Sequence, residues 1–251
     1  MEKKNVFVVG CNGRMGKLVC DLIQKSKELT VAYGFDMNTD SESGINVYCH
    51  PITSLPCPTD VIIDFSRPDA TMEILPLAVD RMVPMVIATT GFTDLQEESI
   101  KDYAKLIPIF KASNMSYGVN AVKELLKLAA QLFYDYDIEI NEFHHRNKAD
   151  APSGTANMFF DTINASRNDA FVSVYGRTEK RTEREIGISS NRGGAFPGEH
   201  TVTFAGSNDF IRIQHFAHNP SIFAEGALNA ALYIMEQTVP RIYTMDDYFK
   251  M

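Results

Sequence analysis

The segment richest in chemically active side chains is Glu142–Thr155, which reads EFHHRNKADAPSGT. Its side chains able to transfer a proton or bind an anion are His144, His145, Arg146, Lys148, Ser153 and Thr155. The Pro-Ser-Gly-Thr stretch predicts the start of a helix, where backbone N–H groups and hydroxyls suit an anion. The segment therefore favours a site for a small carboxylate with proton donors beside it. A polar loop followed by a proline-initiated helix is the alternative interpretation.

A second segment, Gly10–Gly16, has the sequence GCNGRMG and lies between a predicted strand and a predicted helix. It is a variant of the G-x-G-x-x-G fingerprint, in which glycine permits a tight turn and close approach of a pyrophosphate to the backbone. Asp36 lies 20 residues after Gly16, where an acidic residue binds the ribose hydroxyls of a dinucleotide. Together these features predict a nucleotide site, against the alternative of a plain turn.

A further glycine turn, Ala88–Phe92, also follows a predicted strand. Open α/β sheets bind ligands outside the carboxyl ends of their strands, which is where both glycine turns are expected. The two turns can therefore line one cleft.

The elements that must position these segments change in character along the chain. The first 112 residues alternate strands and helices, which favours a parallel, doubly wound sheet. The expected strands are 5–9, 29–35, 61–65, 85–88 and 107–112, with helices at 15–26, 69–80 and 94–106. The later part predicts an α+β block with a mainly antiparallel or mixed sheet. Its expected elements are helix 119–133, strand 138–143, a helix ending near 165, and strands 171–175, 185–190, 200–204 and 210–215. An apolar helix at 223–237 could rejoin the first block.

Composition limits the class of partner. The chain has 24 Lys and Arg against 32 Asp and Glu, a net charge of −8, which disfavours duplex nucleic acid. The positive charge for an anionic ligand must therefore be local, as in Glu142–Thr155. No apolar run approaches the roughly 18 residues of a membrane helix. The 4 Cys form no C-x-x-C pair, so we expect free thiols in a reduced, cytoplasmic compartment.

Several motifs together resemble those of the 4-hydroxy-tetrahydrodipicolinate reductase (dihydrodipicolinate reductase) family of the diaminopimelate–lysine pathway. Glu142–Ala156 matches the family pattern E-x-H-H-x-x-K-x-D-A-P-S-G-T-A throughout. Shorter matches are Gly10–Gly16, Asp64–Pro68, Thr89–Phe92, Ala112–Ser116, Gly118–Asn120 and Gly198–Thr201. The resemblance spans about Val6 to Ala231, nearly the whole chain.

The resemblance implies an α/β fold in which a Rossmann-type, doubly wound parallel sheet is joined to a smaller α+β domain with a mixed sheet. Residues 1–115 and 221–251 would form the dinucleotide-binding domain. Residues 116–220 would bind substrate and build a homotetramer. The implied reaction reduces 4-hydroxy-tetrahydrodipicolinate, a small dicarboxylate, to tetrahydrodipicolinate with loss of water, using NADH or NADPH.

The resemblance also implies roles for individual residues. His144 corresponds to the catalytic proton donor and Lys148 to its partner. The substrate carboxylate contacts correspond to His145, Ser153, Gly154 and Thr155. The expected cofactor contacts are Gly10, Asn12, Gly13, Arg14, Met15, Gly16 and Asp36, with Ala88, Thr89, Thr90, Ala112, Asn114 and Met115 on the nicotinamide side. No metal is implied. Two positions depart from the family pattern, Pro220 in place of an Arg and Ala195 in place of an acid. We expect both to alter loop or subunit contacts rather than the reaction.

Three alternatives have different requirements. Another Rossmann enzyme acting on a small acid, such as aspartate dehydrogenase, would share the glycine turn but would not need the His144–Thr155 run. A nucleotide sensor without catalysis would have no use for His144 and Lys148. A metal site could form where His215 and His218 converge with Glu199-His200, but zinc usually takes three or four ligands at defined spacing.

The first prediction is that NADH is preferred, or is used at least as well as NADPH. The sequence Met37-Asn38-Thr39 follows Asp36 and lacks the Arg that can pair with a 2′-phosphate. Asp36 itself would repel that phosphate, although Lys17 could soften the bias. Steady-state kinetics with both cofactors tests this. A kcat/KM for NADPH more than about tenfold above that for NADH would contradict it.

Overall fold

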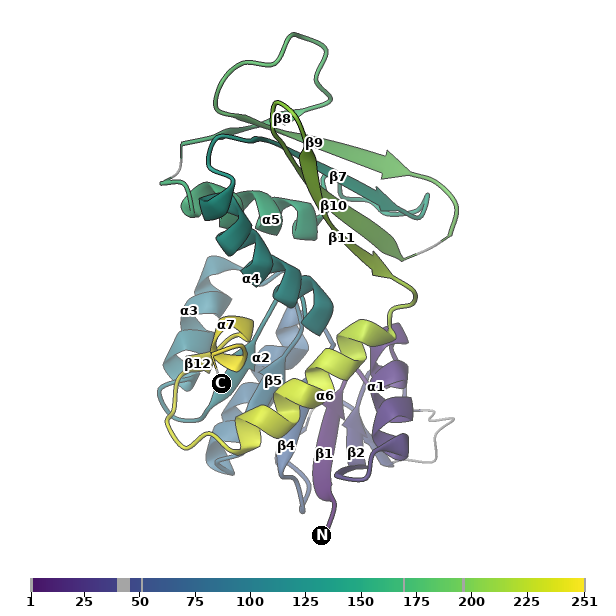
Figure 1. The fold of residues 1–251 in the computed structure, drawn as a ribbon. Coiled ribbons are helices and arrows are strands. Elements are labelled where there is room, and N and C mark those ends of the chain that lie inside the picture. The colour runs from purple at the N-terminus through teal and green to yellow at the C-terminus, as the bar shows by residue number, and fades with distance from the viewer. Residues whose placement is uncertain (1, 40–45, 51, 169, 196, 251) are drawn as a thin grey trace. The chain divides into compact units, whose positions relative to one another are not determined.

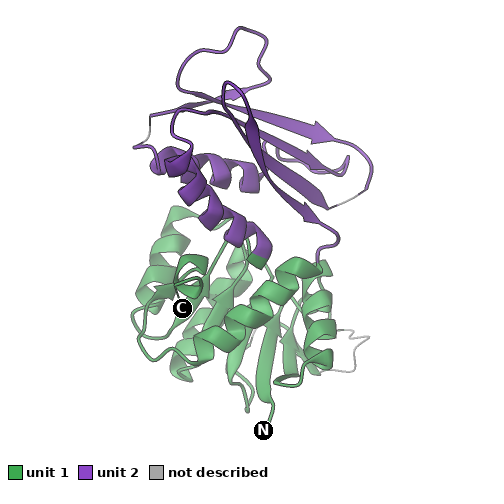
Figure 2. Ribbon diagram, viewed as in Figure 1, with its two compact units in different colours: residues 1–117, 221–251 green, residues 118–220 purple. Residues whose placement is uncertain are grey.

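The computed structural model describes residues 2–39, 46–50, 52–168, 170–195 and 197–250. The chain divides into two compact units, residues 1–117 with 221–251, and residues 118–220 (Figure 2). The first unit thus takes its residues from both ends of the chain. The expected boundary between residues 115 and 116 lies two residues away from the observed one.

The first unit is built on a seven-stranded sheet in which every strand pair is parallel (Figure 1). Its strands, in spatial order, are β12 (Ile242–Tyr243), β6 (Ile109–Lys111), β5 (Met85–Ile87), β4 (Val61–Asp64), β1 (Lys4–Val9), β2 (Leu29–Phe35) and β3 (Asn46–Tyr48). The chain order reverses between β1 and β4. An open α/β sheet forms its ligand crevice at such a switch point, outside the carboxyl ends of the strands.

Helices cover both faces of this sheet. The helices of the unit are α1 (Arg14–Lys25), α2 (Pro68–Asp80), α3 (Asp94–Tyr103), α6 (Ser221–Met235) and α7 (Met245–Tyr248). Along β1, Val6 and Val8 belong to the core cluster that contains α1 and α6 residues, whereas Phe7 and Val9 belong to the cluster with α2 and α3 residues. Because side chains alternate between the faces, a strand covered on both sides must be apolar throughout. The doubly wound sheet is therefore confirmed, and the late helix α6 does rejoin it.

The second unit has a five-stranded mixed sheet with helices α4 (Tyr117–Leu132) and α5 (Gly154–Ala165) packed on one face. Its strands, in spatial order, are β11 (Phe210–Ala217), β10 (Gly198–Ala205), β7 (Asp137–His144), β9 (Glu185–Arg192) and β8 (Val172–Tyr175). The pairs β7–β9 and β8–β9 are parallel, whereas β10 is antiparallel to both of its neighbours. The mixed sheet expected from the sequence is confirmed.

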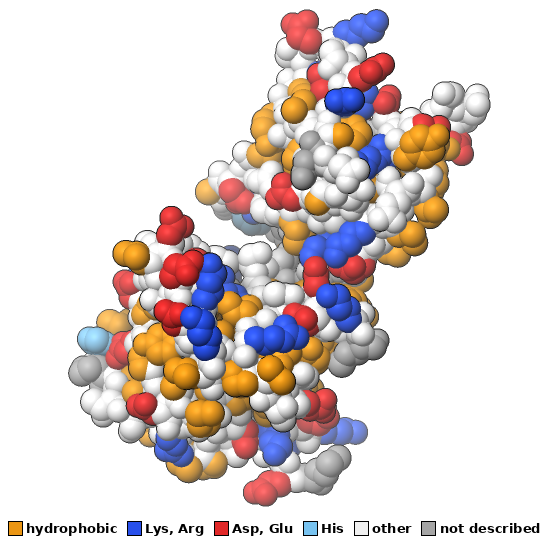
Figure 3. All heavy atoms as spheres, turned by 90° about the vertical axis from the view of Figure 1, so that its left-hand side faces the viewer, with side chains coloured by type: hydrophobic (Ala, Val, Ile, Leu, Met, Phe, Trp, Pro, Cys, Tyr) orange, Lys and Arg blue, Asp and Glu red, His pale blue; other side chains and the backbone are white. Residues whose placement is uncertain are grey.

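The expected elements are all present, with ends displaced by up to three residues. Three short ones were not expected, namely β3, β12 and α7. Among the residues that the structure describes, no helix has both the length and the apolarity that crossing a membrane requires. On the face drawn in Figure 3, basic side chains lie among acidic ones and do not gather into a continuous stripe.

Candidate active site and cofactor cleft

Side chains alternate between the two faces of β7, and two polar residues lie on the face that packs into the core. Ile138, Ile140, Glu142 and His144 are the buried residues of the strand, and the residues between them are exposed or half-buried. Ile138 and Ile140 pack into the apolar cluster against α4 and α5. Glu142 and His144 continue this row to the end of the strand, where they are 1% and 7% exposed. The strand therefore delivers a carboxylate and an imidazole into a largely dry environment.

The Glu142 carboxylate is fully engaged by its neighbours. Its Oε2 lies 2.5 Å from His144 Nδ1 and 2.7 Å from Arg192 Nη1, and its Oε1 lies 2.8 Å from Arg192 Nη2. The Ser153 backbone N–H donates to the same Oε1 at 3.1 Å. Arg192 reaches the carboxylate because it is paired with His144 in the parallel register of β7 and β9. A buried charge is tolerated when a geometrically matched partner and further hydrogen bonds compensate it, as they do here.

These contacts set the charges of the site. Burial alone would raise the pKa of Glu142, but hydrogen bonds from Arg192 and His144 lower that pKa to about 2. Glu142 is therefore ionised at neutral pH and can only accept, so His144 Nδ1 carries a proton. Burial lowers the pKa of His144, and Glu142 opposes this shift by stabilising the imidazolium. An imidazole whose tautomer is fixed by a carboxylate presents Nε2 for proton transfer.

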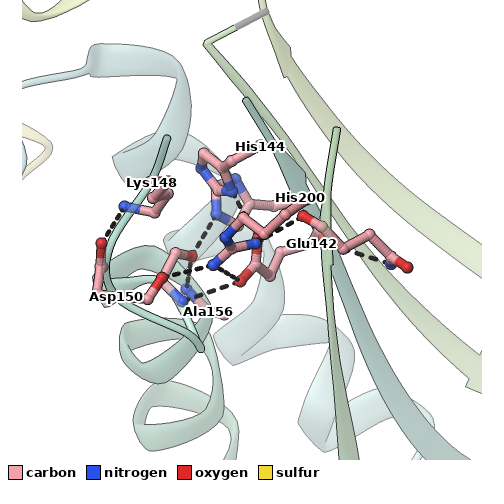
Figure 4. Close-up of polar contacts among 9 residues, drawn as sticks. Glu142, His144, Lys148, Asp150, Ala156 and His200 are labelled. Atoms are coloured by element: carbon pink, nitrogen blue, oxygen red, sulfur yellow. Dashed lines mark hydrogen bonds and ion pairs between the residues drawn. The ribbon is translucent and has the colours of Figure 1, made fainter. Parts of the chain in front are cut away.

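A second histidine packs beside the first. The rings of His144 and His200 lie 4.9 Å apart at 72° (Figure 4). Burial, together with the nearby His144, lowers the pKa of His200 to about 3, so its ring is neutral. Glycine is required at position 198, because a Cβ there would lie 2.4 Å from His144 Nε2. His200 and Gly198 thus both pack against the His144 ring and limit its orientation.

The predicted carboxylate anchor lies at the start of α5. Ser153 is 1% exposed and its Oγ lies 2.8 Å from His200 Nε2, while accepting from the Ala156 N–H at 3.2 Å. Ser153 therefore caps the helix and supports the histidine pair. Gly154 is exposed and Thr155 half-buried, in the first turn of the helix.

Lys148 is held by a neighbouring acid. Its Nζ lies 2.8 Å from Asp150 Oδ1, and Figure 4 shows the side chain directed at that carboxylate. Burial would raise the pKa of Asp150, but the hydrogen bond from Lys148 and backbone N–H groups, including that of Gly154, lower it. Asp150 thus holds the ammonium and the helix start with one carboxylate. His145 is half-buried in the same loop.

The Gly10–Gly16 turn has the geometry of a dinucleotide cradle. Gly10 has φ +78°, and a Cβ on it would lie 2.8 Å from the Phe65 carbonyl oxygen. A Cβ on Gly16 would lie 2.0 Å from the Gly10 oxygen, so α1 approaches the turn as only glycine allows. Beside this turn lies a cavity of about 710 Å³ in the first unit. Its lining includes Gly10, Asn12, Gly13, Asp36, Ser66 and Arg67.

Asp36 follows β2 and turns toward the glycine loop. Its Oδ2 accepts from the Asn12 N–H at 2.9 Å and its Oδ1 from the Asn38 N–H at 3.1 Å. The structure thus brings Asp36 to the same cavity as Gly10, Asn12 and Gly13. These residues fit a dinucleotide, since they combine a pyrophosphate cradle with an acid for the ribose.

The other predicted cofactor residues have varied surroundings. Arg14 opens α1 and is exposed, while Met15, Ala88 and Ala112 pack partly buried against the core cluster of α1 and α6. Met115 is 2% exposed, Asn114 accepts from the Ser116 N–H through its side chain, and Thr89 is buried against Asp64. Thr90 is exposed. None of these is among the residues that line the 710 Å³ cavity.

Sequence reasoning assigned no role to several residues that form these sites. They are Arg192 and Gly198 in the second unit, and Asp64, Phe65, Ser66 and Arg67 in the first. His200 was considered only as a metal ligand, and Glu142 only as part of the matched motif. The signal was present, because Asp64–Pro68 and Gly198–Thr201 are among the matched motifs. The proposed convergence of His200 with other metal ligands is not seen: no group of three His, Cys, Asp or Glu within the described ranges could hold a metal ion.

Comparison with known proteins identifies the family. The family described as "Dihydrodipicolinate reductase, N-terminus" matches residues 4–115, and "Dihydrodipicolinate reductase, C-terminus" matches residues 118–249. The chain belongs to the dihydrodipicolinate reductase family. Among the relatives, "4-hydroxy-tetrahydrodipicolinate reductase" of Caldanaerobacter subterraneus subsp. tengcongensis is 42% identical over 248 residues, 98% of each chain. The protein of the same name from Clostridium novyi is 40% identical, again over 98% of each chain.

A solved member of the family shares the fold. The dipicolinate-bound dihydrodipicolinate reductase of Paenisporosarcina sp. TG-14 matches with a TM-score of 0.77 and 22% identity, covering 97% of this chain and 98% of its own. At that identity the likeness supports the fold of this dihydrodipicolinate reductase family member and no more.

The second prediction concerns the buried Glu142 carboxylate. Because its pKa is lowered from 4.5 to about 2 in the folded chain, its ionised form stabilises the fold. This contribution is complete above about pH 5 and is lost as the pH falls through about 2. We expect the difference in unfolding free energy between the wild type and Glu142→Gln to shrink by about 3 kcal/mol between pH 5 and pH 2.

Denaturant titrations across that pH range measure the difference. Glu139→Gln is the matched control, because Glu139 lies on the same strand but pairs at 2.9 Å with Arg177 on the half-exposed side. A difference for Glu142→Gln that stays constant from pH 5 to pH 2 would contradict the assigned charge.

Proposed function

We propose that this chain reduces 4-hydroxy-tetrahydrodipicolinate to tetrahydrodipicolinate, with loss of water, in cytoplasmic diaminopimelate and lysine biosynthesis. The observation that carries the proposal is the Glu142–His144 pair on β7, backed by Arg192 and set beside Lys148 and the start of α5. A cluster of this kind serves proton transfer to an anionic substrate. The names of the curated relatives, which match over nearly their whole length, support the same reaction.

We assign the first unit to nicotinamide nucleotide binding and the second to the substrate. The bound NADH or NADPH supplies a hydride. Gly10, Asn12 and Gly13 would hold its pyrophosphate and Asp36 its ribose, since these residues line one cavity. A preference for NADH is supported by Met37, which is 80% exposed beside Asp36 and carries no charge.

Loss of the C4 hydroxyl as water, together with a proton from C3, would give a C=C bond conjugated to the C=N bond of the substrate ring. Addition of a hydride from the cofactor at C4 would then develop negative charge toward C3 and the ring nitrogen. His144 would donate a proton to this charge from Nε2, and Glu142 would stabilise the imidazolium before transfer. Lys148 would stabilise the same charge or supply a proton itself. Either step requires Lys148 to exchange its ion pair with Asp150 for a contact with substrate.

The substrate is a dianion, so its carboxylates need local positive charge in a protein of net charge −8. We place one carboxylate at the first turn of α5, near Ser153, Gly154 and Thr155, where the positive end of the helix dipole favours an anion. His145 and Lys148 would add charge-assisted hydrogen bonds. The description of the Paenisporosarcina protein as bound to dipicolinate, a related dicarboxylate, supports this substrate class.

Self-association through the second unit completes the proposal. Large apolar side chains are exposed on the outer strands of its sheet, namely Val172 and Tyr175 on β8, and Phe210 and Phe216 on β11. Exposed apolar side chains on edge strands favour pairing with another chain. A homotetramer built on this sheet would cover them.

One assay tests the reaction. The substrate is generated in situ by a synthase from pyruvate and aspartate semialdehyde, and oxidation of NADH and of NADPH is followed at equal concentrations. Mixtures without pyruvate, and mixtures of oxaloacetate with ammonia, control for reduction of the semialdehyde and for aspartate dehydrogenase activity. No pyruvate-dependent oxidation with either cofactor would contradict the proposal.

The third prediction concerns proton donation. His144→Gln and Lys148→Ala should each lower kcat by about 10²–10⁴-fold, the usual contribution of general acid catalysis, with little change in the Kd for NADH. The double variant should lose less than the product of the two effects, because both residues act on one charge. His218→Gln, at an exposed site on the same unit, is the matched control. Near-normal kcat in His144→Gln would remove His144 from this role.

The fourth prediction concerns carboxylate binding. Thr155→Val keeps the shape of the first turn of α5 but removes the hydroxyl, so it should raise the substrate KM more than it lowers kcat. Thr155→Ser retains the hydroxyl and should behave like the wild type. Pyridine-2,6-dicarboxylate should inhibit competitively with substrate and bind more weakly to Thr155→Val. Unchanged KM and inhibition in Thr155→Val would place the carboxylate elsewhere.

A further inference from the structure

A second buried carboxylate lies in the first unit, at the carboxyl end of β4. Asp64 is 0% exposed, and burial raises its pKa although several hydrogen bonds act in the opposite direction. The rest of β4 is Val61, Ile62 and Ile63, each fully buried and apolar. A buried carboxylate is costly unless hydrogen bonds compensate it. The groups that donate hydrogen bonds to Asp64 therefore indicate its role.

The partners of Asp64 come from three separate elements. Its Oδ1 accepts from the Ser66 N–H at 2.8 Å, from Ser66 Oγ at 2.5 Å and from Thr89 Oγ1 at 3.0 Å. Its Oδ2 accepts from Thr71 Oγ1 at 2.5 Å. Ser66 lies in the turn after β4, Thr71 in α2, and Thr89 in the turn after β5. The Asp64 side chain thus connects three elements: the turn after β4, the turn after β5 and helix α2.

The turn that Asp64 holds is also a wall of the cofactor cavity. Phe65, Ser66 and Arg67 line this cavity together with Gly10, Asn12 and Gly13 of the glycine turn. The Phe65 N–H donates to the Val9 carbonyl at 3.0 Å. The space for a Cβ on Gly10 is taken by the Phe65 carbonyl oxygen at 2.8 Å and by Ser66 Cα at 3.0 Å. A shift of the turn after β4 would therefore change the shape of the cradle.

The turn after β5 is bound to the same group. The Ala88 N–H donates to the Asp64 carbonyl oxygen at 2.9 Å, and the Thr89 side chain is buried against the Asp64 carboxylate. The Thr89 hydroxyl and the Ala88 N–H thus tie the backbone of this turn to Asp64 at two points, while the Thr90 side chain is exposed. The position of this backbone therefore depends on Asp64.

We propose that Asp64 is a positioning residue for cofactor binding, which fixes the turns after β4 and β5 against the Gly10–Gly16 cradle. The inference rests on the proposed binding of a nicotinamide nucleotide to the first unit. Preorganised backbone groups bind a ligand more tightly, because no ordering of loops is then required on binding. Asp64 does not touch the cofactor, and it acts through Ser66, Thr71 and Thr89.

The test compares Asp64→Asn with Asp60→Asn. Asp60 precedes the same strand, and its Oδ2 accepts from the Asn5 N–H at 2.6 Å and from Asn5 Nδ2 at 3.0 Å. It thus makes similar hydrogen bonds at the opposite, amino end of the sheet. The Kd for NADH is measured by nicotinamide fluorescence, KM and kcat by steady-state kinetics, and Tm by thermal unfolding.

For Asp64→Asn we expect the Kd and KM for NADH to rise about tenfold, as for the loss of one hydrogen bond to a charged group. The kcat at saturating NADH should stay within about threefold of the wild type, since the proton-donating residues belong to the second unit. Asp60→Asn should lower Tm but leave the Kd within about twofold. A purely structural role for Asp64 would instead lower Tm in both variants and leave both Kd values unchanged.

Other outcomes decide against the proposal. A Kd within about twofold of the wild type in folded Asp64→Asn overturns it, as does an equal rise in Asp60→Asn. If Asp64→Asn does not fold, Thr71→Val decides the question, because Thr71 is fully buried and does not line the cavity. A rise in Kd supports the inference and an unchanged Kd overturns it. A wild type that binds neither NADH nor NADPH would contradict the proposed function itself.

Discussion

The polar cluster of the second unit, which includes Glu142, His144 and Arg192, depends on the burial of one carboxylate among the core residues of β7. Glu142 is tolerated there because Arg192 binds both of its oxygens from the neighbouring strand. The remaining acceptor capacity is taken by His144 Nδ1 and by the N–H of Ser153. These contacts simultaneously fix the tautomer of His144 and bring the loop before α5 against the sheet. Removing Arg192 would leave the buried Glu142 carboxylate without a compensating charge, which is strongly destabilising.

The first unit must also place polar groups beside an apolar core, and it does so at the ends of its strands. Its parallel strands are covered on both faces, so polar groups gather where the strands end, at the carboxyl edge. Asp36 and Asp64 both lie at this edge, and each accepts backbone N–H groups from a turn. Asp36 stays partly exposed and faces the cavity, whereas Asp64 is enclosed. One acid is thus placed to meet a ligand and the other to shape the site that receives it.

The sequence predicted the fold class, the two blocks and most elements, because the hydrophobic periods of long segments are local properties. The strands β3 and β12 have only three and two residues, too few for any period to be recognised. The pairing of Glu142 with Arg192 was not predictable in this way, since it joins residues 50 positions apart through the parallel register of β7 and β9. The motif around His144 and Lys148 predicted where the candidate site lies. The use of Ser153 as a helix cap and the exclusion of a side chain at Gly198 required the three-dimensional structure.

The two ion pairs of this cluster differ in what they would offer to the dianion of the proposed reaction. Arg192 is committed to Glu142, whose side chain is completely buried, so this cation contributes little charge to an incoming ligand. Lys148 is paired with Asp150, whose side chain is 57% exposed. An ion pair in such a position contributes little to stability, because water competes for both partners. In the proposed reaction a substrate carboxylate would therefore replace the Asp150 carboxylate at little cost to the fold, and Lys148 would bind it. The buried pair thus holds the imidazole of His144 in place, whereas the exposed pair holds the cation proposed to bind the substrate.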